Sequence, residues 1–295
     1  MPLVTVILPT RKRNHLLPRA LQSALAQTWR DFEIIIVDDN LPEMRISTVP
    51  QLKLLLRDPR IRVIENPNQR SSAAIARNVG LRIARGEWLT YLDDDDAYHP
   101  QKLEKQLQRA RETNLPVGLC GLAYNLAGGR RRLCQVSHDL YLEDDLLLDA
   151  AADTKAIFHR RSNNVWFNEN LPAAEDAYFF QSLLAHWKLN QVFNIPEALI
   201  EVFPQRGPRV NTNAEGLWLT NQKIIQDFAH RYSARAISTF MARAQLQDLK
   251  LRPGGFGKTI RAATKLFLLR GPRETRLILN ACLYKVPVLR SWLKS

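Results

Sequence analysis

The stretch SSAAIARNVGLRIARGEWLTYLDDDDAYHP, residues 71–100, contains the pattern that decides the fold. Residues 71–86 begin with serine, a preferred helix cap, and end with glycine, which predicts a helix. Residues 87–92 predict a buried strand. Four consecutive aspartates, Asp93–Asp96, follow that strand, although a turn needs only one for its side-chain-to-backbone bond. Their mutual repulsion suggests that something positive belongs beside them, and an acidic turn in solvent is the simpler alternative.

The same alternation of strands and helices extends over the first 115 residues. The sequence predicts further strands at 3–9, 32–40 and 61–66, a helix that Asn14 can cap, and a helix at 100–112. Alternation of this kind is typical of an α/β fold with a mostly parallel mixed sheet sandwiched by helices.

Two acidic clusters follow strands of this predicted sheet. Asp38 and Asp39 end the strand at 32–40, and Asp93–Asp96 follow the strand at 87–92. In open α/β sheets, ligands bind at the carboxyl ends of the strands. Carboxylates there can hold Mg²⁺ or Mn²⁺ together with phosphate oxygens of a substrate, and the metal stabilises a diphosphate leaving group. In an extended segment, Asp93 and Asp95 would project to one side and Asp94 to the other.

Four ordered motifs resemble glycosyltransferase family 2: VTVILPTRKRN, QTWRDFEIIIVDDN, residues 71–106, and AAEDAYFFQSLLAH. The similarity is strong over residues 3–108 and weaker to about 204. It implies a GT-A fold, which is a Rossmann-like nucleotide-binding fold. It also implies inverting transfer of a sugar from a nucleoside diphosphate donor, with a UDP- or dTDP-sugar favoured.

The resemblance assigns five residues to the nucleotide-sugar donor. Thr10 and Arg11 would line the nucleotide pocket, Asp39 would bond the base, and Arg77 would support the nucleotide side. Asp94 would face the ribose or the donor sugar. The aromatic residue usual in the family at position 11 is replaced by Arg11, which removes the stacking partner of the base.

The resemblance assigns the metal and the proton transfer to four further residues. Asp93 and Asp95 would form the ends of a D-x-D motif for Mn²⁺ or Mg²⁺, with Asp95 as the direct ligand. Asp176 would be the catalytic base that inverting transfer requires, with Glu175 beside it. An acidic residue at the start of a helix is also an ordinary partner of the helix dipole, so this simpler interpretation stays open for Asp176.

The charge of the chain is concentrated at its C-terminal end. The formal net charge is +13, and residues 250–295 contain eleven Lys or Arg and one acid, which gives +10. We therefore predict a glycosyltransferase domain over residues 1–250 and a basic, amphipathic, helical extension over 251–295. Such an extension can bind an anionic membrane surface, or it can pack on the catalytic domain.

The composition is that of a soluble globular protein, with 45% hydrophobic and 24% charged residues. No apolar run approaches the roughly 18 residues of a membrane span, and the N-terminus lacks signal-peptide features. We therefore expect a cytoplasmic protein, peripheral on the cytosolic face of the membrane.

The sequence thus predicts a metal-dependent inverting glycosyltransferase with a saccharide or lipid-linked acceptor, acting in cell-surface polysaccharide assembly, with no nucleic-acid partner. A sugar-phosphate nucleotidyltransferase is one alternative, although PTRKRN lacks the glycine-rich loop that such enzymes use. A non-catalytic nucleic-acid-binding protein that uses the basic tail is another alternative, and it leaves the two acidic clusters unexplained.

Overall fold

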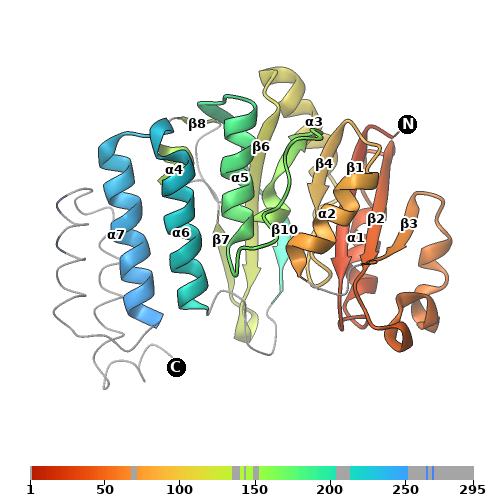
Figure 1. Cartoon of the computed structure of the whole chain (residues 1–295). Helices are drawn as coiled ribbons and strands as arrows, with labels where there is room; N and C mark the ends of the chain where they lie inside the picture. Colours follow the sequence, from red (N-terminus) through yellow and green to blue (C-terminus); the bar gives the residue numbers. More distant parts are fainter. Residues whose placement is uncertain are drawn as a thin grey trace. The chain divides into compact units, whose positions relative to one another are not determined.

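The predicted strands form one mixed sheet in the computed structural model (Figure 1). The structure describes residues 2–67, 72–134, 140–142, 144–148, 153–203 and 213–251, together with residues 264 and 268. At the centre lie β1 (Val4–Thr10), β2 (Phe32–Asp38) and β4 (Trp88–Tyr91). All seven residues of β2 are buried, as expected for a parallel strand covered on both faces.

The sheet has the strand order β3-β2-β1-β4-β9-β6-β10-β5, with β7 paired to β6 and β8 paired to β10. Strands β3, β2, β1 and β4 are mutually parallel, and β6 is parallel to β10. Antiparallel pairs connect the remaining strands. The other strand bounds are β3 Ile61–Glu65, β5 Ala97–Tyr98, β6 Val117–Asn125, β7 Arg131–Cys134, β8 Leu140–Leu142, β9 Phe158–Arg160 and β10 Gln191–Val202.

The strand order reverses its direction at β1. The chain moves outward from β1 to β2 and β3, and then returns to place β4 on the other side of β1. Such a reversal is the switch point at which open α/β sheets form their ligand crevice, beyond the carboxyl ends of the two strands. The segments that follow β1 and β4 are therefore the structurally expected binding loops.

The return connection depends on α2 (Ala73–Ile83), which packs on β1 and β2 (Figure 1). As predicted, a serine caps this helix, because the side chain of Ser72 accepts from the backbone N–H of Ile75. The chain then passes β1 at Gly86, where a Cβ atom would lie 2.5 Å from the backbone nitrogen of Thr5. Glycine at this position lets β4 enter the sheet beside β1.

The two other helices of the first 115 residues are α1 (Leu17–Leu25) and α3 (Lys102–Thr113). The prediction that Asn14 caps α1 is wrong, because the cap position is Leu16 and its side chain makes no capping hydrogen bond. The Asn14 side chain instead donates to the carbonyl oxygen of Met44. Four short 3₁₀ turns, η1 to η4, lie between Pro42 and Arg57.

Contacts divide the chain into two compact units. One contains Met1–Leu142, Ala150–Glu169 and Ser182–Arg206, and therefore holds the sheet. The other contains Glu143–Asp149, Asn170–Gln181 and Gly207–Ser295. Its described helices are α4 (Asp145–Leu148), the first part of α5 (Glu175–His186), α6 (Ala214–Phe228) and α7 (Ala234–Leu251). In α6 and α7, Leu217, Ile224 and Leu246 are buried, which gives this unit an apolar interior.

The helical C-terminal region is confirmed as far as α7. The basic extension predicted for residues 251–295 lies almost entirely outside the described residues, so the boundary near residue 250 stays a prediction. Among the described helices, none is both long and apolar enough to cross a membrane.

A buried lysine in α3 predicts a pH dependence of stability. The Nζ of Lys102 donates to Thr90 Oγ1 (2.9 Å) and Gln106 Oε1 (2.7 Å), both neutral. Burial lowers the pKa of Lys102 from 10.5 to about 8. Between these values the unfolded chain binds more protons than the folded chain, so stability rises with pH. The shift corresponds to about 3 kcal/mol over the full window.

We therefore expect the unfolding free energy of the wild-type protein to rise as the pH increases from about 8. Lys102→Met should lack this rise, and the difference between the unfolding free energies of the two proteins is most direct between pH 8 and 9. The comparison is needed because burial raises the pKa of the Cys120 thiol to about 11, which lowers stability above pH 9 in both proteins. An identical pH dependence in both proteins would contradict this prediction.

Candidate active site

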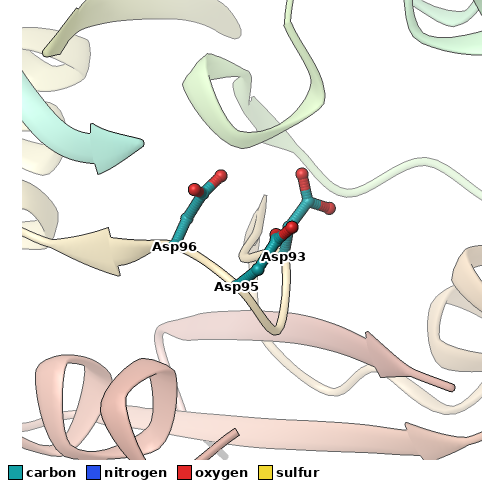
Figure 2. Close-up of side chains that lie close together, drawn as sticks. All are labelled: Asp93, Asp95 and Asp96. Atoms are coloured by element: carbon teal, nitrogen blue, oxygen red, sulfur yellow. The ribbon is translucent and has the colours of Figure 1, made fainter. Parts of the chain in front are cut away.

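The four aspartates form a tight turn at the carboxyl end of β4. The backbone N–H of Leu92 still donates to Ile7 O of β1 (3.0 Å), and the N–H of Asp96 then closes the turn on Asp93 O (3.2 Å). The expectation of an extended segment is therefore wrong here. Because the chain turns, Asp96 joins Asp93 and Asp95 on one side, and one carboxylate oxygen from each lies within 4.8 Å of the others (Figure 2). We call residues 93–96 the acidic turn.

Asp94 contacts the end of β1. Its buried carboxylate accepts a hydrogen bond from Thr10 Oγ1 at 2.8 Å, across the switch point between β4 and β1. Arg13 Nη1 lies 3.4 Å from the other oxygen of Asp94. Thr10 thereby ties the loop after β1 to the acidic turn.

In the part of the chain that the structure describes, three cationic side chains contact the carboxylates of the acidic turn. Arg77, in α2, donates to Asp93 Oδ1 at 2.9 Å, and its side chain is only 7% exposed. Arg13 donates to Asp95 Oδ2 at 2.8 Å and is 47% exposed. Lys155 contacts Asp93, Asp96 and a further acid, Asp153, which lies outside the turn. The expected positive partners are thus present.

The charges of this cluster do not balance. Among the described residues, five carboxylates, the four of the turn and that of Asp153, face three contacting cations, so the acidic groups outnumber the basic ones by two. A fourth cation, Arg19, donates to the backbone oxygen of Asp95 and stacks on the ring of Phe203. A cluster of carboxylate oxygens with excess negative charge fits a hard divalent cation.

Burial and neighbouring charges move the pKa values of the four aspartates apart. Burial alone would raise the pKa of Asp93, but Lys155 and Arg77 outweigh it and lower this pKa to about 2. Burial raises the pKa of Asp94 to about 6, despite Thr10 and Arg13. Burial also raises the pKa values of Asp95 and Asp96. Asp93 is therefore the most acidic carboxylate of the turn.

A second polar group lies at the same edge of the sheet, after β2. The backbone N–H of Asp39 donates to Thr10 O at 3.0 Å, and Asn66 donates to Asp39 Oδ1 at 2.6 Å. The guanidinium of Arg11 is half exposed, and its Nε lies 4.0 Å from Asp39 Oδ2. Thr10, Arg11 and Asp39 are therefore brought together as predicted, with Asn66 added.

The neighbouring Asp38 has a structural role. Its buried carboxylate accepts from the backbone N–H groups of Asn40 (3.1 Å) and Ile46 (2.9 Å). These bonds fix the chain that leaves β2 and so hold Asp39 at the edge of the sheet.

Glu175 and Asp176 occupy the first turn of α5, in the second unit. The preceding Ala174 has a positive φ of 51°, and Asp176 Oδ1 accepts from the N–H of Ala177 at 2.8 Å. Both acids are partly exposed. Their assignment as catalytic base stays a prediction.

Sequence reasoning missed four residues of the site: Arg13, Asn66, Asp96 and Lys155. Asn66 directly follows β3, and Arg13 lies in the loop that follows β1, so their positions at strand ends could have indicated them. Asp96 required recognition of the turn. Lys155 lies about sixty residues beyond the acidic turn, and no local pattern marks it.

Comparison with solved structures identifies the fold. The whole chain aligns with TarS 1–349 of S. aureus in complex with UDP-GlcNAc, with a TM-score of 0.66, 17% identity and 92% of that chain covered. It also aligns over 99% of its length with the mannosyltransferase PcManGT of Pyrobaculum calidifontis in complex with GDP-Man and Mn²⁺. That TM-score is 0.60, with 16% identity and 83% of that chain covered. The class defined by this architecture is the GT-A fold.

The family model described as "Glycosyl transferase family 2" matches residues 5–170, more than half of the chain. The protein therefore belongs to glycosyltransferase family 2.

Two curated relatives are similar to parts of the chain. The succinoglycan biosynthesis protein ExoO of Rhizobium meliloti is 29% identical over 201 residues, 63% of this chain. A GalNAc(5)-diNAcBac-PP-undecaprenol beta-1,3-glucosyltransferase of Campylobacter jejuni is 38% identical over 112 residues, 38% of this chain. The alignments span only 56% and 36% of these relatives' own lengths.

Proposed function

We propose that the protein is a metal-dependent, inverting glycosyltransferase. It moves a sugar from a nucleoside diphosphate donor to a hydroxyl group of a saccharide or lipid-linked acceptor. Family membership supports this over a nucleotidyltransferase or a nucleic-acid-binding protein.

One observation carries the proposal: the acidic turn lies at the switch point of the sheet and gathers three carboxylates within 4.8 Å. These carboxylates fit Mn²⁺ or Mg²⁺, since both ions take oxygen ligands and often share them with phosphates. Asp95 and Asp93 would hold the ion, with Asp96 beside them. A bound divalent cation neutralises the diphosphate and so makes it a better leaving group.

The chain's own residues then bind and orient the donor. Asp39, held by Asn66, accepts a hydrogen bond from the base, and Arg11 lines the same nucleotide pocket. Asp94, fixed by Thr10, faces the ribose or the sugar. The half-exposed Arg13 is close enough to the acidic turn to assist the phosphates.

Sugar transfer is a single in-line displacement. Asp176 accepts the proton of the acceptor hydroxyl as that oxygen bonds to the anomeric carbon, and the bond from this carbon to the diphosphate breaks. The configuration at the anomeric carbon is inverted.

The donor base can be found by a thermal-shift screen of UDP, dTDP and GDP, each with and without Mn²⁺. We expect UDP or dTDP with Mn²⁺ to raise the Tm most, because a ligand that binds only the folded state stabilises it by RT ln(1 + [L]/Kd), which increases with the affinity of the ligand. UDP-GlcNAc in TarS supports a uridine donor, whereas GDP-Man in PcManGT makes GDP the informative competitor. A larger shift with GDP, or equal shifts without Mn²⁺, would contradict this expectation.

The relatives support an acceptor in polysaccharide assembly. One is named for succinoglycan biosynthesis, and the other for transfer to an undecaprenyl diphosphate-linked glycan. A lipid-linked acceptor would place this protein at the cytosolic face of the membrane. The net charge of +10 on residues 250–295 fits binding to an anionic surface there.

We therefore expect the full-length protein to bind vesicles that contain anionic lipid and to ignore neutral vesicles. Each Lys or Arg near an anionic surface contributes about 1 kcal/mol, so four of the eleven would give roughly a thousandfold in partitioning. High salt should release the protein, since screening weakens this attraction. Equal sedimentation with neutral and anionic vesicles would contradict membrane binding through charge.

A further inference from the structure

Lys155 is a buried cationic residue beside the acidic turn, and the proposed function assigns it no role. Lys155 lies in a single 3₁₀ turn, η6 (Thr154–Ala156), that precedes β9, and its side chain is only 9% exposed. The ammonium group of Lys155 lies between the nearby Asp153 and two acids that are distant in sequence, all on the unit that holds the sheet.

Three carboxylates surround this ammonium group. Its Nζ lies 2.8 and 2.9 Å from the two oxygens of Asp153, and 3.3 Å from Asp93 Oδ2 and from Asp96 Oδ2. The ammonium group of Lys155 thus forms ion pairs with all three carboxylates.

Two of the three clustered carboxylates are thus held in place by buried cations and a backbone N–H of the protein itself. Asp93 is held by Lys155 and Arg77, and Asp96 by Lys155 and the backbone N–H of Phe203. Asp95 differs, because its contacting cation is the half-exposed Arg13. Lys155 relieves the repulsion among the acids when no ion is bound, and its charge opposes a second cation bound by the same carboxylates.

We propose that Lys155 is a fixed counter-cation of the acidic turn: it offsets the repulsion between Asp93 and Asp96 when no ion is bound, and its charge lowers the affinity of the turn for a divalent cation. This inference rests on the proposed metal-dependent function. Asp153 has the opposite effect on cation affinity, since its carboxylate lies outside the turn and partly neutralises the charge of Lys155.

The test is the affinity for Mn²⁺ alone, measured from the electron paramagnetic resonance signal of free Mn²⁺ without nucleotide or acceptor. Lys155→Met removes a positive charge beside the ion and should bind Mn²⁺ at least about tenfold more tightly. Asp153→Asn removes a negative charge and should bind it about tenfold more weakly. Lys155→Arg keeps the charge and should remain within a few-fold of the wild type.

The opposite signs distinguish a charge effect from a merely structural one. If both Lys155→Met and Asp153→Asn weaken Mn²⁺ binding, loss of local structure explains the data and the inference is overturned. Unchanged affinity in Lys155→Met overturns it as well. Should Lys155→Met fail to fold, Lys155→Gln removes the charge but keeps a hydrogen-bond donor, and the same tightening is expected of it.

Stability gives a second readout with a matched control. Without metal, Lys155→Met should unfold at a lower temperature than the wild type, and Mn²⁺ should recover much of the loss. Lys102→Met also removes a buried lysine, but one whose partners are neutral, so its change in Tm should be the same with and without Mn²⁺. Equal responses of the two variants to Mn²⁺ would overturn the inference.

The failure of this inference is distinguishable from that of the proposed function. If the charge variants bind Mn²⁺ with the same affinity as the wild type, only the role proposed for Lys155 is contradicted. If the charge variants shift Mn²⁺ affinity as expected but no nucleotide donor binds, the glycosyltransferase proposal fails and the counter-cation stands. A wild type and variants that all ignore Mn²⁺ overturn both.

Discussion

Asp95→Asn is expected to abolish the Mn²⁺-dependent binding of the nucleotide donor. Of the three clustered carboxylates, that of Asp95 is held by a half-exposed arginine, whereas Asp93 and Asp96 have buried partners. Asp95 therefore loses the least interaction energy when its carboxylate binds an ion. An amide lacks the negative charge that a hard cation requires. The loss of donor affinity should reach at least about 10²-fold, the upper range for changes to residues that merely support metal ligands.

Calorimetric titration of the donor, with Mn²⁺ and with EDTA, measures this loss. Asp31→Asn is the matched control, because Asp31 is an exposed aspartate just before β2, at the opposite edge of the sheet from the acidic turn. It should bind the donor as the wild type does. Mn²⁺-dependent donor binding of normal strength in Asp95→Asn would contradict the assignment, and Asp93 and Asp96 would then have to hold the ion without it.

Local patterns predicted the central part of the fold. Strands β1 to β4 and helices α1 to α3 lie where apolar runs, a serine cap and glycine or proline signals placed them, because their buried faces depend on near neighbours in sequence. The sequence did not place β9 between β4 and β6, or β5 against β10. Strand β9 has three residues and β5 has two, too few for a recognisable pattern, and their paired residues lie 40 to 104 positions away in the sequence.

The candidate site was predictable where strand ends defined it. Thr10, Asp39 and Asp93–Asp95 follow strands that the sequence could identify, so their meeting at one edge follows from parallel topology. The geometry within the acidic turn was not predictable, because an aspartate run suits both an extended and a turned segment. Lys155 could not be predicted, since a lone lysine gains its meaning only from the three carboxylates around it.

The assignment of Asp176 predicts a large kinetic effect with little effect on binding. Asp176→Asn should lower the rate of sugar transfer by about 10²- to 10⁴-fold, because the amide cannot accept the proton of the acceptor hydroxyl. The donor Kd should change little, since the proposed donor residues belong to β1, β2, α2 and the acidic turn, whereas Asp176 lies in α5. Single-turnover transfer at saturating donor, compared with donor titration, separates these two effects.

Glu175→Gln resolves the alternative in which Asp176 serves only the dipole of α5. Both acids lie in the first turn of the helix, so neutralising either removes one favourable charge, a loss of about 0.3–1 kcal/mol of stability. If Asp176 is the base, the two variants lose similar stability but only Asp176→Asn loses transfer. If both keep near-normal transfer, the helix-dipole interpretation is correct and the base lies elsewhere. If Glu175→Gln alone is inactive, the proton goes to Glu175, and the catalytic assignment moves by one residue.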